Sequence, residues 1–266
     1  MSFVSFNDMT GRTVLVNYPP QKIISLVPSQ TELLFDLGLE DETIGITKFC
    51  IHPDSWFRTK KRIGGTKNVN IEAIKALQPD LIIANKEENT KEQVELLATL
   101  FPVWISDIKS IEEAIEMIKQ IGAITDKNDQ AERIVENIRH NKDSIAKEKN
   151  KAEKVAYLIW RNPWMCAGGD TFISNMITEA GWTNVFSDRQ RYPEITLEEL
   201  KVAIPDHIFL SSEPYPFKET HIREIKESIP DVKITLVDGE MFSWYGSRLI
   251  MAFPYLNELK KSLENI

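Results

Sequence analysis

The sequence predicts an α/β protein with two similar lobes, mainly parallel sheets, and one long helix that joins the lobes. Short apolar runs alternate with helical stretches in both halves of the chain, which is typical of βαβ units. A charged stretch without proline or glycine separates the two halves. A pattern of helix, Pro-Asp and strand recurs on both sides of that stretch.

The expected strands are short runs rich in β-branched residues. They are residues 21–27, 43–47, 80–85 and 103–106 in the first half, and 154–160, 207–212 and 232–237 in the second. The stretches between them have helical spacing of apolar residues. They include residues 28–38, 70–78, 90–100, 110–122 and 171–181.

Residues 126–150 read as one amphipathic helix. Their apolar side chains repeat at helical spacing, and charged residues occupy the other positions. These apolar residues are Ala131, Ile134, Val135, Ile138 and Ile145. About 24 helical residues span roughly 36 Å, the length of a small domain. We therefore expect an N-terminal lobe over 1–123, a connecting backbone helix over 124–150, and a C-terminal lobe over 151–266.

The recurring pattern is "NIEAIKALQPDLIIAN" at 70–85 and "TLEELKVAIPDHIFLS" at 196–211. Each copy begins with a residue suited to an N-cap and carries a glutamate two positions later, Glu72 or Glu198. The offset between the copies is 198 − 72 = 126. The simplest role for these glutamates is to stabilise the first helical turn through the helix dipole.

Composition excludes several classes of protein. The 266 residues are 42% hydrophobic and 27% charged, as in ordinary globular proteins. A net charge of −8 argues against nucleic acid as a partner, because phosphate binding needs a basic face. There is no apolar run of the roughly 18 residues that a membrane span requires. The first 16 residues lack the features of a secretory signal, which leaves a cytoplasmic location open.

Motifs for catalysis and metal binding are missing as well. The sequence has no GxSxG elbow, P-loop, GxGxxG or HExxH, so we expect no enzyme and no cofactor, although an enzyme of another type stays an alternative. Cys50 and Cys166 have neither zinc nor redox spacing, and no disulfide is expected between them. Cys50 and His52, in "FCIHPDSW", are weak candidates for a soft-metal pair.

Aromatic residues and arginines gather where strands of the second half end. In open α/β sheets, ligands bind beyond the carboxyl ends of the strands, and aromatic loops there build partly apolar pockets. Core packing is the competing interpretation for any single aromatic residue. We expect residues 238–248 to form the lip of a ligand pocket on the second lobe. The candidate ligand residues of this half are Trp160, Trp164, Tyr192, Tyr215, Phe242, Trp244, Tyr245 and Arg248.

Three segments, "KIISLVPSQTELLFDLG", "NIEAIKALQPDLIIA" and "VDGEMFSWYGSR", resemble substrate-binding proteins of bacterial ABC importers. The subgroup is the helical-backbone type that binds cobalamin, ferric siderophores or haem. The resemblance runs from about Asn7 to the C-terminus, and "SLVPSQTE" is among its most specific parts. It implies a monomer with a ligand cleft between two lobes, little hinge motion, no catalysis, and a place outside the cytoplasm.

Within this subgroup the sequence looks closest to the cobalamin-binding branch. The implied function is capture of a bulky metal chelate, preferably a cobalamin-like corrinoid, for delivery to an ABC permease. A ferric siderophore or haem binder and a direct metal-ion-binding protein stay as alternatives. The ligand contacts that we expect on the first lobe are Pro28, Ser29, Cys50, Lys67 and Asn85.

Two features of these expectations depend on the resemblance. Around Thr66 and Lys67, and at Asn85, the branch can carry pocket tryptophans, so the first-lobe wall is more polar here. In the family, one acidic residue on each lobe docks onto basic residues of the permease. Glu72 and Glu198 match that position in the two lobes.

Overall fold

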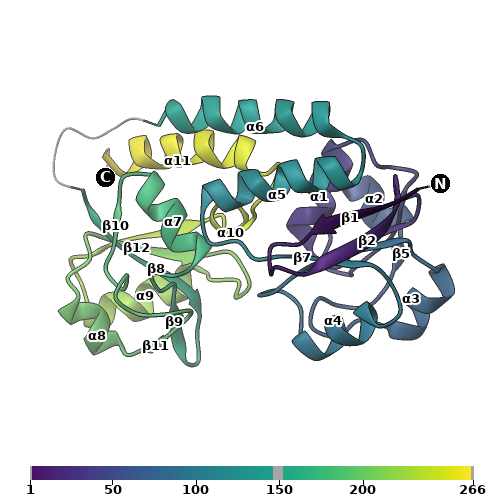
Figure 1. The fold of residues 1–266 in the computed structure, drawn as a ribbon. Helices are drawn as coiled ribbons and strands as arrows, with labels where there is room; N and C mark the ends of the chain where they lie inside the picture. Colours follow the sequence, from purple (N-terminus) through teal and green to yellow (C-terminus); the bar gives the residue numbers. More distant parts are fainter. Residues whose placement is uncertain (1, 146–151, 265–266) are drawn as a thin grey trace. The chain divides into compact units, whose positions relative to one another are not determined.

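The computed structural model describes residues 2–145 and 152–264, and its α/β fold divides into two compact units (Figure 1). Unit 1 comprises Met1–Ile108, Glu112–Arg139 and Tyr245–Arg248. Unit 2 comprises Lys109–Ile111, His140–Trp244 and Leu249–Ile266. No helix within the described ranges is long and apolar enough to cross a membrane.

Unit 1 is built on a fully parallel sheet with the strand order β5-β4-β3-β6-β7. The chain starts this sheet in the middle, goes to one side with β4, and later to the other side with β6, so the carboxyl end of β3 is a topological switch point. The strands are β3 (Ile23–Ser25), β4 (Thr43–Ile46), β5 (Lys61–Arg62), β6 (Leu81–Asn85) and β7 (Val103–Ser106). The helices that connect them are α1 (Pro28–Asp36), α2 (Asp54–Thr59), α3 (Ile71–Leu77) and α4 (Lys91–Ala98).

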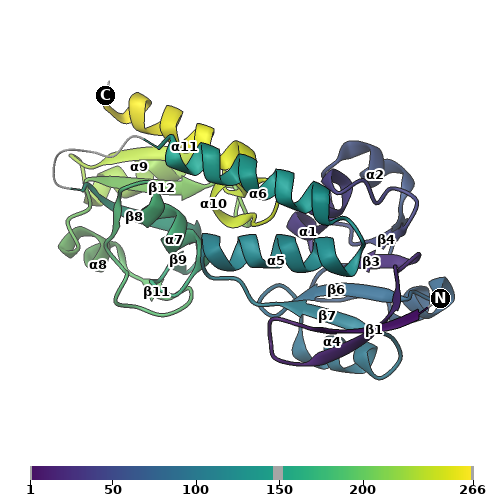
Figure 2. The same cartoon turned by 45° about the horizontal axis from the view of Figure 1, so that its top comes forward.

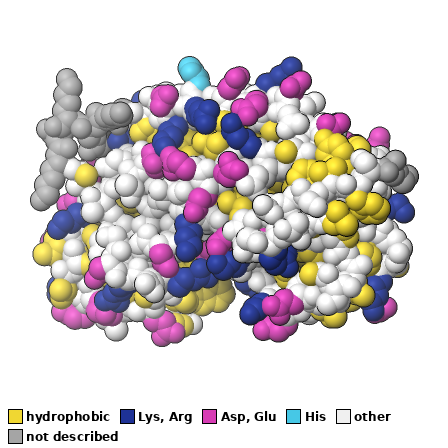
Figure 3. Space-filling model, in the orientation of Figure 1, with side chains coloured by type: hydrophobic (Ala, Val, Ile, Leu, Met, Phe, Trp, Pro, Cys, Tyr) yellow, Lys and Arg dark blue, Asp and Glu magenta, His cyan; other side chains and the backbone are white. Residues whose placement is uncertain are grey.

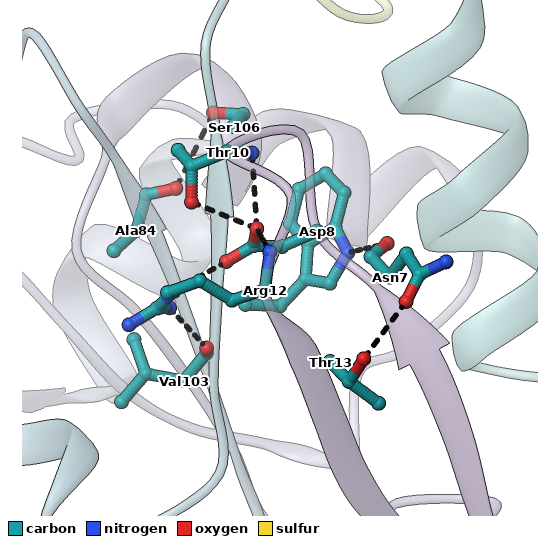
Figure 4. Close-up of polar contacts among 9 residues, drawn as sticks. Asn7, Asp8, Thr10, Arg12, Thr13, Ala84, Val103 and Ser106 are labelled. Atoms are coloured by element: carbon teal, nitrogen blue, oxygen red, sulfur yellow. Dashed lines mark hydrogen bonds and ion pairs between the residues drawn. The ribbon is translucent and has the colours of Figure 1, made fainter.

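A two-stranded hairpin that the sequence reasoning did not foresee precedes this sheet. It pairs β1 (Ser2–Asn7) with β2 (Thr13–Tyr18) and lies beside β7 in both ribbon views (Figures 1 and 2). Its turn is organised by the buried carboxylate of Asp8, which accepts hydrogen bonds from Thr10 and Arg12 (Figure 4). Arg12 also donates to the carbonyl oxygen of Val103 at 2.9 Å. One carboxylate therefore shapes the turn, and its arginine partner ties the hairpin to the sheet.

Unit 2 carries a six-stranded mixed sheet with the order β11-β9-β8-β12-β13, and β10 pairs with β8. The strands are β8 (Lys154–Trp160), β9 (Trp164–Cys166), β10 (Thr183–Asn184), β11 (Glu194–Ile195), β12 (His207–Ser211) and β13 (Lys233–Val237). Its helices are α7 (Phe172–Glu179), α8 (Leu197–Val202), α9 (Glu219–Ser228), α10 (Glu240–Ser243) and α11 (Leu249–Glu264). The expected two-lobed α/β class is confirmed, with β9 and β11 as antiparallel additions.

The expected connecting helix is shorter than residues 124–150. It is α6 (Asn128–Asp143), and it follows α5 (Ile111–Ile124) after a turn at Asp126, whose φ is 59°. The predicted apolar stripe of α6 is buried, and the division between the units falls inside this helix, after Arg139. Residues 144–145 are not helical, and residues 146–150 of the expected helix lie outside the described residues.

The recurring sequence pattern forms the same local structure in each unit. The side chain of Asn70 accepts a hydrogen bond from the first turn of α3, and Thr196 does the same at α8. The aspartate that follows each proline then accepts backbone N–H groups at the start of a neighbouring strand. Asp80 binds Lys22 at 2.8 Å, and Asp206 binds Lys154 at 2.7 Å.

We predict that Asp8→Ala lowers the free energy of unfolding by about 2–4 kcal/mol, because it removes a buried charged acceptor with several donors. Chemical denaturation followed by tryptophan fluorescence measures the change. Asp54→Ala is the matched control, since its carboxylate pairs with Arg58 in solvent and should matter little. Equal midpoints for the two variants would contradict the role assigned to Asp8.

Candidate ligand-binding surfaces

Unit 1 contains a pocket of about 750 Å³ at the carboxyl ends of β4 and β5. It is lined by Lys48 and Phe49, which follow β4, and by residues 64–70, which follow β5. Phe49 is 51% exposed, so an aromatic ring is available to a ligand. The described residues that line the pocket include two lysines and no acidic residue. This surface therefore combines an apolar face with positive charge.

The loop over residues 64–70 is held in a tight conformation. Gly64 has a φ of 102°, and a Cβ atom there would lie 2.6 Å from the carbonyl oxygen of Asn68. Only glycine fits such a position. The Gly65 amide donates to the same carbonyl at 2.9 Å, and Val69 donates to Gln93 at 2.8 Å. The loop is thus fixed by its own backbone and presents Lys67 at its exposed tip, where Nζ donates to the carbonyl oxygen of Glu87.

The other ligand candidates expected on the first lobe lie deeper. Asn85 is buried, accepts the amides of Glu87 and Glu88 at 2.8 and 2.9 Å, and donates to Ser106 at 2.9 Å. Its side chain therefore shapes the turn after β6. Ser29 is buried and Pro28 is half-buried in the first turn of α1. Ligand contact by these residues stays a prediction, and Lys67 is the candidate that lines the pocket.

Cys50 is a buried thiol held between two hydroxyl groups. Its sulfur lies 3.0 Å from Oγ1 of Thr31 and 3.1 Å from Oγ1 of Thr47. Burial raises the pKa of the Cys50 thiol, and a neutral thiol is a poor metal ligand. The described part of the chain contains no group of three or more His, Cys, Asp or Glu residues arranged to hold a metal. Both Cys50 and Cys166 are free.

Unit 2 gathers several predicted residues into one aromatic cluster, which we define as Trp160, Trp164, Tyr215, Phe217 and His221. Tyr215 packs edge-on against Trp160 and Phe217, with ring centroids 5.5 and 4.9 Å apart. Trp164 stacks on Phe217 at 6.0 Å. Trp160, at the end of β8, is 39% exposed. The cluster therefore offers a partly open aromatic surface, and ligand binding by its residues stays a prediction.

Polar groups hold this cluster in place. His221 lies 3.1 Å from the hydroxyl of Tyr215, and Arg161 stacks over Trp164 at 5.3 Å. Arg161 also makes two hydrogen bonds to Glu224, at 2.5 and 2.7 Å. The guanidinium of Arg161 is therefore engaged by Trp164 and Glu224 within unit 2. Tyr192, a further predicted residue, is half-buried and comes from the loop before β11.

Residues 238–248 differ from the expected lip on the second lobe. Residues 240–243 form α10, where Phe242 is fully buried against Tyr157 and Phe209. Trp244 is buried, and its indole donates to Glu213 at 2.9 Å. Both aromatic side chains therefore belong to the packing of unit 2, which is the competing interpretation given by the sequence.

The next four residues, Tyr245–Arg248, belong to unit 1 instead of the second lobe. Arg248 is only 6% exposed and forms a two-point ion pair with Glu32 of α1, at 2.7 and 2.8 Å. Tyr245 is buried, and Gly246 adopts a φ of 104° close to the carbonyl oxygen of Ser29. The guanidinium expected to anchor a ligand thus has a carboxylate partner within the protein, and its ligand contact stays a prediction.

Sequence reasoning missed Lys48, Phe49 and His221. Lys48 and Phe49 lie two and three residues after the end of β4. The rule that ligands bind beyond strand ends, used above for the second half, would therefore have found them in the first half. His221 has no such signal, because only the fold of the loop before α9 brings it to Tyr215. The two expected docking residues, Glu72 and Glu198, are both exposed on short helices.

Glu213, which accepts the hydrogen bond from the Trp244 indole, has a raised pKa. Burial raises the pKa of its carboxyl above the ordinary value of 4.5, and the Glu240 carboxylate raises it further. The hydrogen bonds from Ser243 and Trp244 act in the opposite direction. Glu32 follows the same pattern, since burial raises its pKa and the Arg248 guanidinium opposes the shift.

The two α/β units have the fold of periplasmic binding proteins. Residues 23–233 match the family model described as periplasmic binding protein, and the chain belongs to that family. This match confirms the resemblance that the sequence motifs suggested.

Curated relatives of the chain include a vitamin B12-binding protein and an ABC transporter substrate-binding lipoprotein. It is 27% identical over 199 residues to a vitamin B12-binding protein of Vibrio campbellii, covering 73% of this chain and 72% of that protein. It is 27% identical over 268 residues to an uncharacterised ABC transporter substrate-binding lipoprotein of Bacillus subtilis, covering 96% and 84%.

Solved structures share the fold. The periplasmic vitamin B12-binding protein of Vibrio cholerae matches with a TM-score of 0.78 at 21% identity, covering 93% of this chain and 99% of that one. A possible iron-binding periplasmic protein of Staphylococcus epidermidis matches with a TM-score of 0.76 at 26% identity, covering 92% and 99%.

We predict that Glu213→Gln changes how stability depends on pH. Because the folded-state pKa of Glu213 is raised, the folded protein holds this proton more tightly than the unfolded chain. The free energy of unfolding of the wild type should therefore fall relative to the variant as pH rises from about 4.5. The difference should level off above the raised pKa. Urea denaturation across this range measures it, and Glu258→Gln, at an exposed side chain, should follow the wild type.

Proposed function

We propose that the protein is a non-catalytic substrate-binding protein that captures a bulky metal chelate, preferably a cobalamin-like corrinoid, and delivers it to an ABC permease. The pocket of unit 1 carries this proposal. Its volume of about 750 Å³ is within the usual range for ligand sites, and it lies beyond the carboxyl ends of strands. The vitamin B12-binding relatives support the corrinoid as ligand.

The lining of the pocket suits a large ring with polar side groups. The exposed ring of Phe49 offers an apolar surface to one face of a macrocycle. Thr66 and Asn68 supply hydroxyl and amide groups that can bond carboxamides. The aromatic cluster of unit 2 is a further candidate surface for the ligand, because the partly exposed Trp160 can stack on a flat group.

One observation favours a second candidate, an anionic chelate such as haem or a ferric siderophore. Lys48 and Lys67 give the pocket positive charge, and none of its described lining residues is acidic. Lysines stabilise carboxylates through charge-assisted hydrogen bonds. A corrinoid rich in neutral amides gains less from such groups than a ligand with carboxylates. The two candidates therefore differ in how strongly they depend on the lysines.

We predict that Lys48→Ala with Lys67→Ala weakens hemin binding by about tenfold or more but changes cyanocobalamin binding much less. Absorbance titrations with each compound measure both affinities. Lys91→Ala, at an exposed lysine of α4 outside the pocket, is the matched control. If neither compound binds the wild type, the preferred ligands are wrong. If Phe49→Ala leaves all binding unchanged, the pocket is not the site.

We also propose that Glu72 and Glu198 dock the protein onto the permease, outside the cytoplasm. Both are exposed near the start of equivalent helices, α3 and α8. Glu72 pairs with Lys75 at 2.8 Å, an exposed and therefore weak interaction that a stronger basic partner can replace. The net charge of −8 fits a partner with basic recesses.

We predict that Glu72→Gln with Glu198→Gln abolishes association with the permease encoded nearest this gene, and that each single change weakens it. The loss should shrink as salt increases, because exposed charges are screened. A pull-down at low and high salt measures the effect, and thermal melts check the fold. Undiminished association of the double variant would leave both glutamates as ordinary helix starts.

A further inference from the structure

The helix that carries Glu198 ends in two exposed apolar side chains. Val202 is the last residue of α8 and Ile204 follows two positions later, and each is 71% exposed. Val202 lies four residues after Glu198, so the two share one helix face. Figure 3 shows hydrophobic and acidic side chains next to each other over the part of unit 2 where Figure 1 places α8. We call Glu198, Val202 and Ile204 the α8 patch.

The repeat supplies an internal comparison for this patch. With the constant offset of 126, Val202 corresponds to Ala76 and Ile204 corresponds to Gln78. The first unit thus has a small and a polar residue where the second has two exposed apolar ones. The side chain of Gln78 also donates to the carbonyl oxygen of Lys75 at 2.7 Å, which satisfies the end of α3. An isoleucine has no such donor, so the exchange brings no local benefit.

The backbone conformation at position 204 makes an isoleucine there more unusual. Its φ is 49°, in the left-handed region, as is the φ of 48° at Gln78. A β-branched side chain is strained in this region, because its Cβ substituents crowd the backbone. Ile204 therefore combines backbone strain with exposure of an apolar side chain to water. Stability within unit 2 does not explain this residue, whereas burial against a partner does.

We propose that Val202 and Ile204 are apolar anchors for the permease, placed beside the charged contact of Glu198. This inference rests on the proposed function and adds that the two units dock unequally. Glu198 and Val202 share one face of α8 and Ile204 follows two residues later, which fits a permease surface with a basic group next to an apolar recess. The equivalent positions of unit 1, Glu72, Ala76 and Gln78, offer the charge without the apolar anchors.

The test replaces the anchors by the residues of the other repeat. The variant Val202→Ala with Ile204→Gln should bind the permease about tenfold more weakly, since burial of two apolar side chains is lost. The loss should persist at high salt, unlike the loss in Glu198→Gln, because apolar contacts are not screened. Leu96→Gln on α4, a matched control at a leucine that is 49% exposed, should bind like the wild type. Biolayer interferometry against the permease in nanodiscs measures all four proteins.

Thermal melts show whether weaker binding of the double variant comes from a loss of folding stability. The double variant should melt at or above the temperature of the wild type, because glutamine suits the left-handed backbone better than isoleucine. Binding equal to the wild type would overturn the inference while leaving the docking glutamates in place. An equal loss in Leu96→Gln would overturn it too. If the wild type binds a chelate but does not bind the permease, the proposed docking is wrong and this inference is wrong with it. The proposed ligand-binding function would still stand.

Discussion

The buried ion pair between Glu32 and Arg248 holds together side chains that are 216 positions apart in the chain. It joins α1 to the segment Tyr245–Arg248, which belongs to unit 1 although it lies far along the chain. Charges removed from water are stable only when they are well paired, and both hydrogen bonds here are 2.8 Å or shorter. The glycine conformation at Gly246 and the burial of Tyr245 follow from seating this segment against α1.

The strand ends of unit 1 differ in whether their polar side chains are already bonded within the protein. The switch point of the sheet lies at the carboxyl end of β3, the usual location for ligands in open α/β sheets. Here the polar side chains at these strand ends bond one another. Thr31 donates to Ser25 at 2.8 Å, and Asn85 donates to Ser106 at 2.9 Å. The loops after β4 and β5 carry Lys48 and Lys67, which line the pocket together with the exposed ring of Phe49.

The two copies of the helix and Pro-Asp pattern show how one local device serves both units. In each copy a side chain caps the helix, a residue in the left-handed region ends it, and an aspartate holds the start of a neighbouring strand. All of these steps are local, so they recur with the sequence. At the left-handed position the backbone conformation recurs but the side chain does not, since Gln78 in one copy is replaced by Ile204 in the other.

The sequence by itself determined the α/β class, the two lobes, most strand positions and the apolar face of α6, because these depend on local periodicity and short-range caps. It also placed Trp160, Trp164 and Tyr215 at strand ends, where the structure gathers them. Only the tertiary structure decided which aromatic residues are open and which are packed. Phe242 and Trp160 are both aromatic residues near the end of a predicted strand. In the structure Phe242 is fully buried, whereas Trp160 is partly exposed. Likewise, the sequence predicts Arg248 as a ligand contact, whereas in the structure it pairs with Glu32. No local sequence pattern encodes a contact between residues so far apart in the chain.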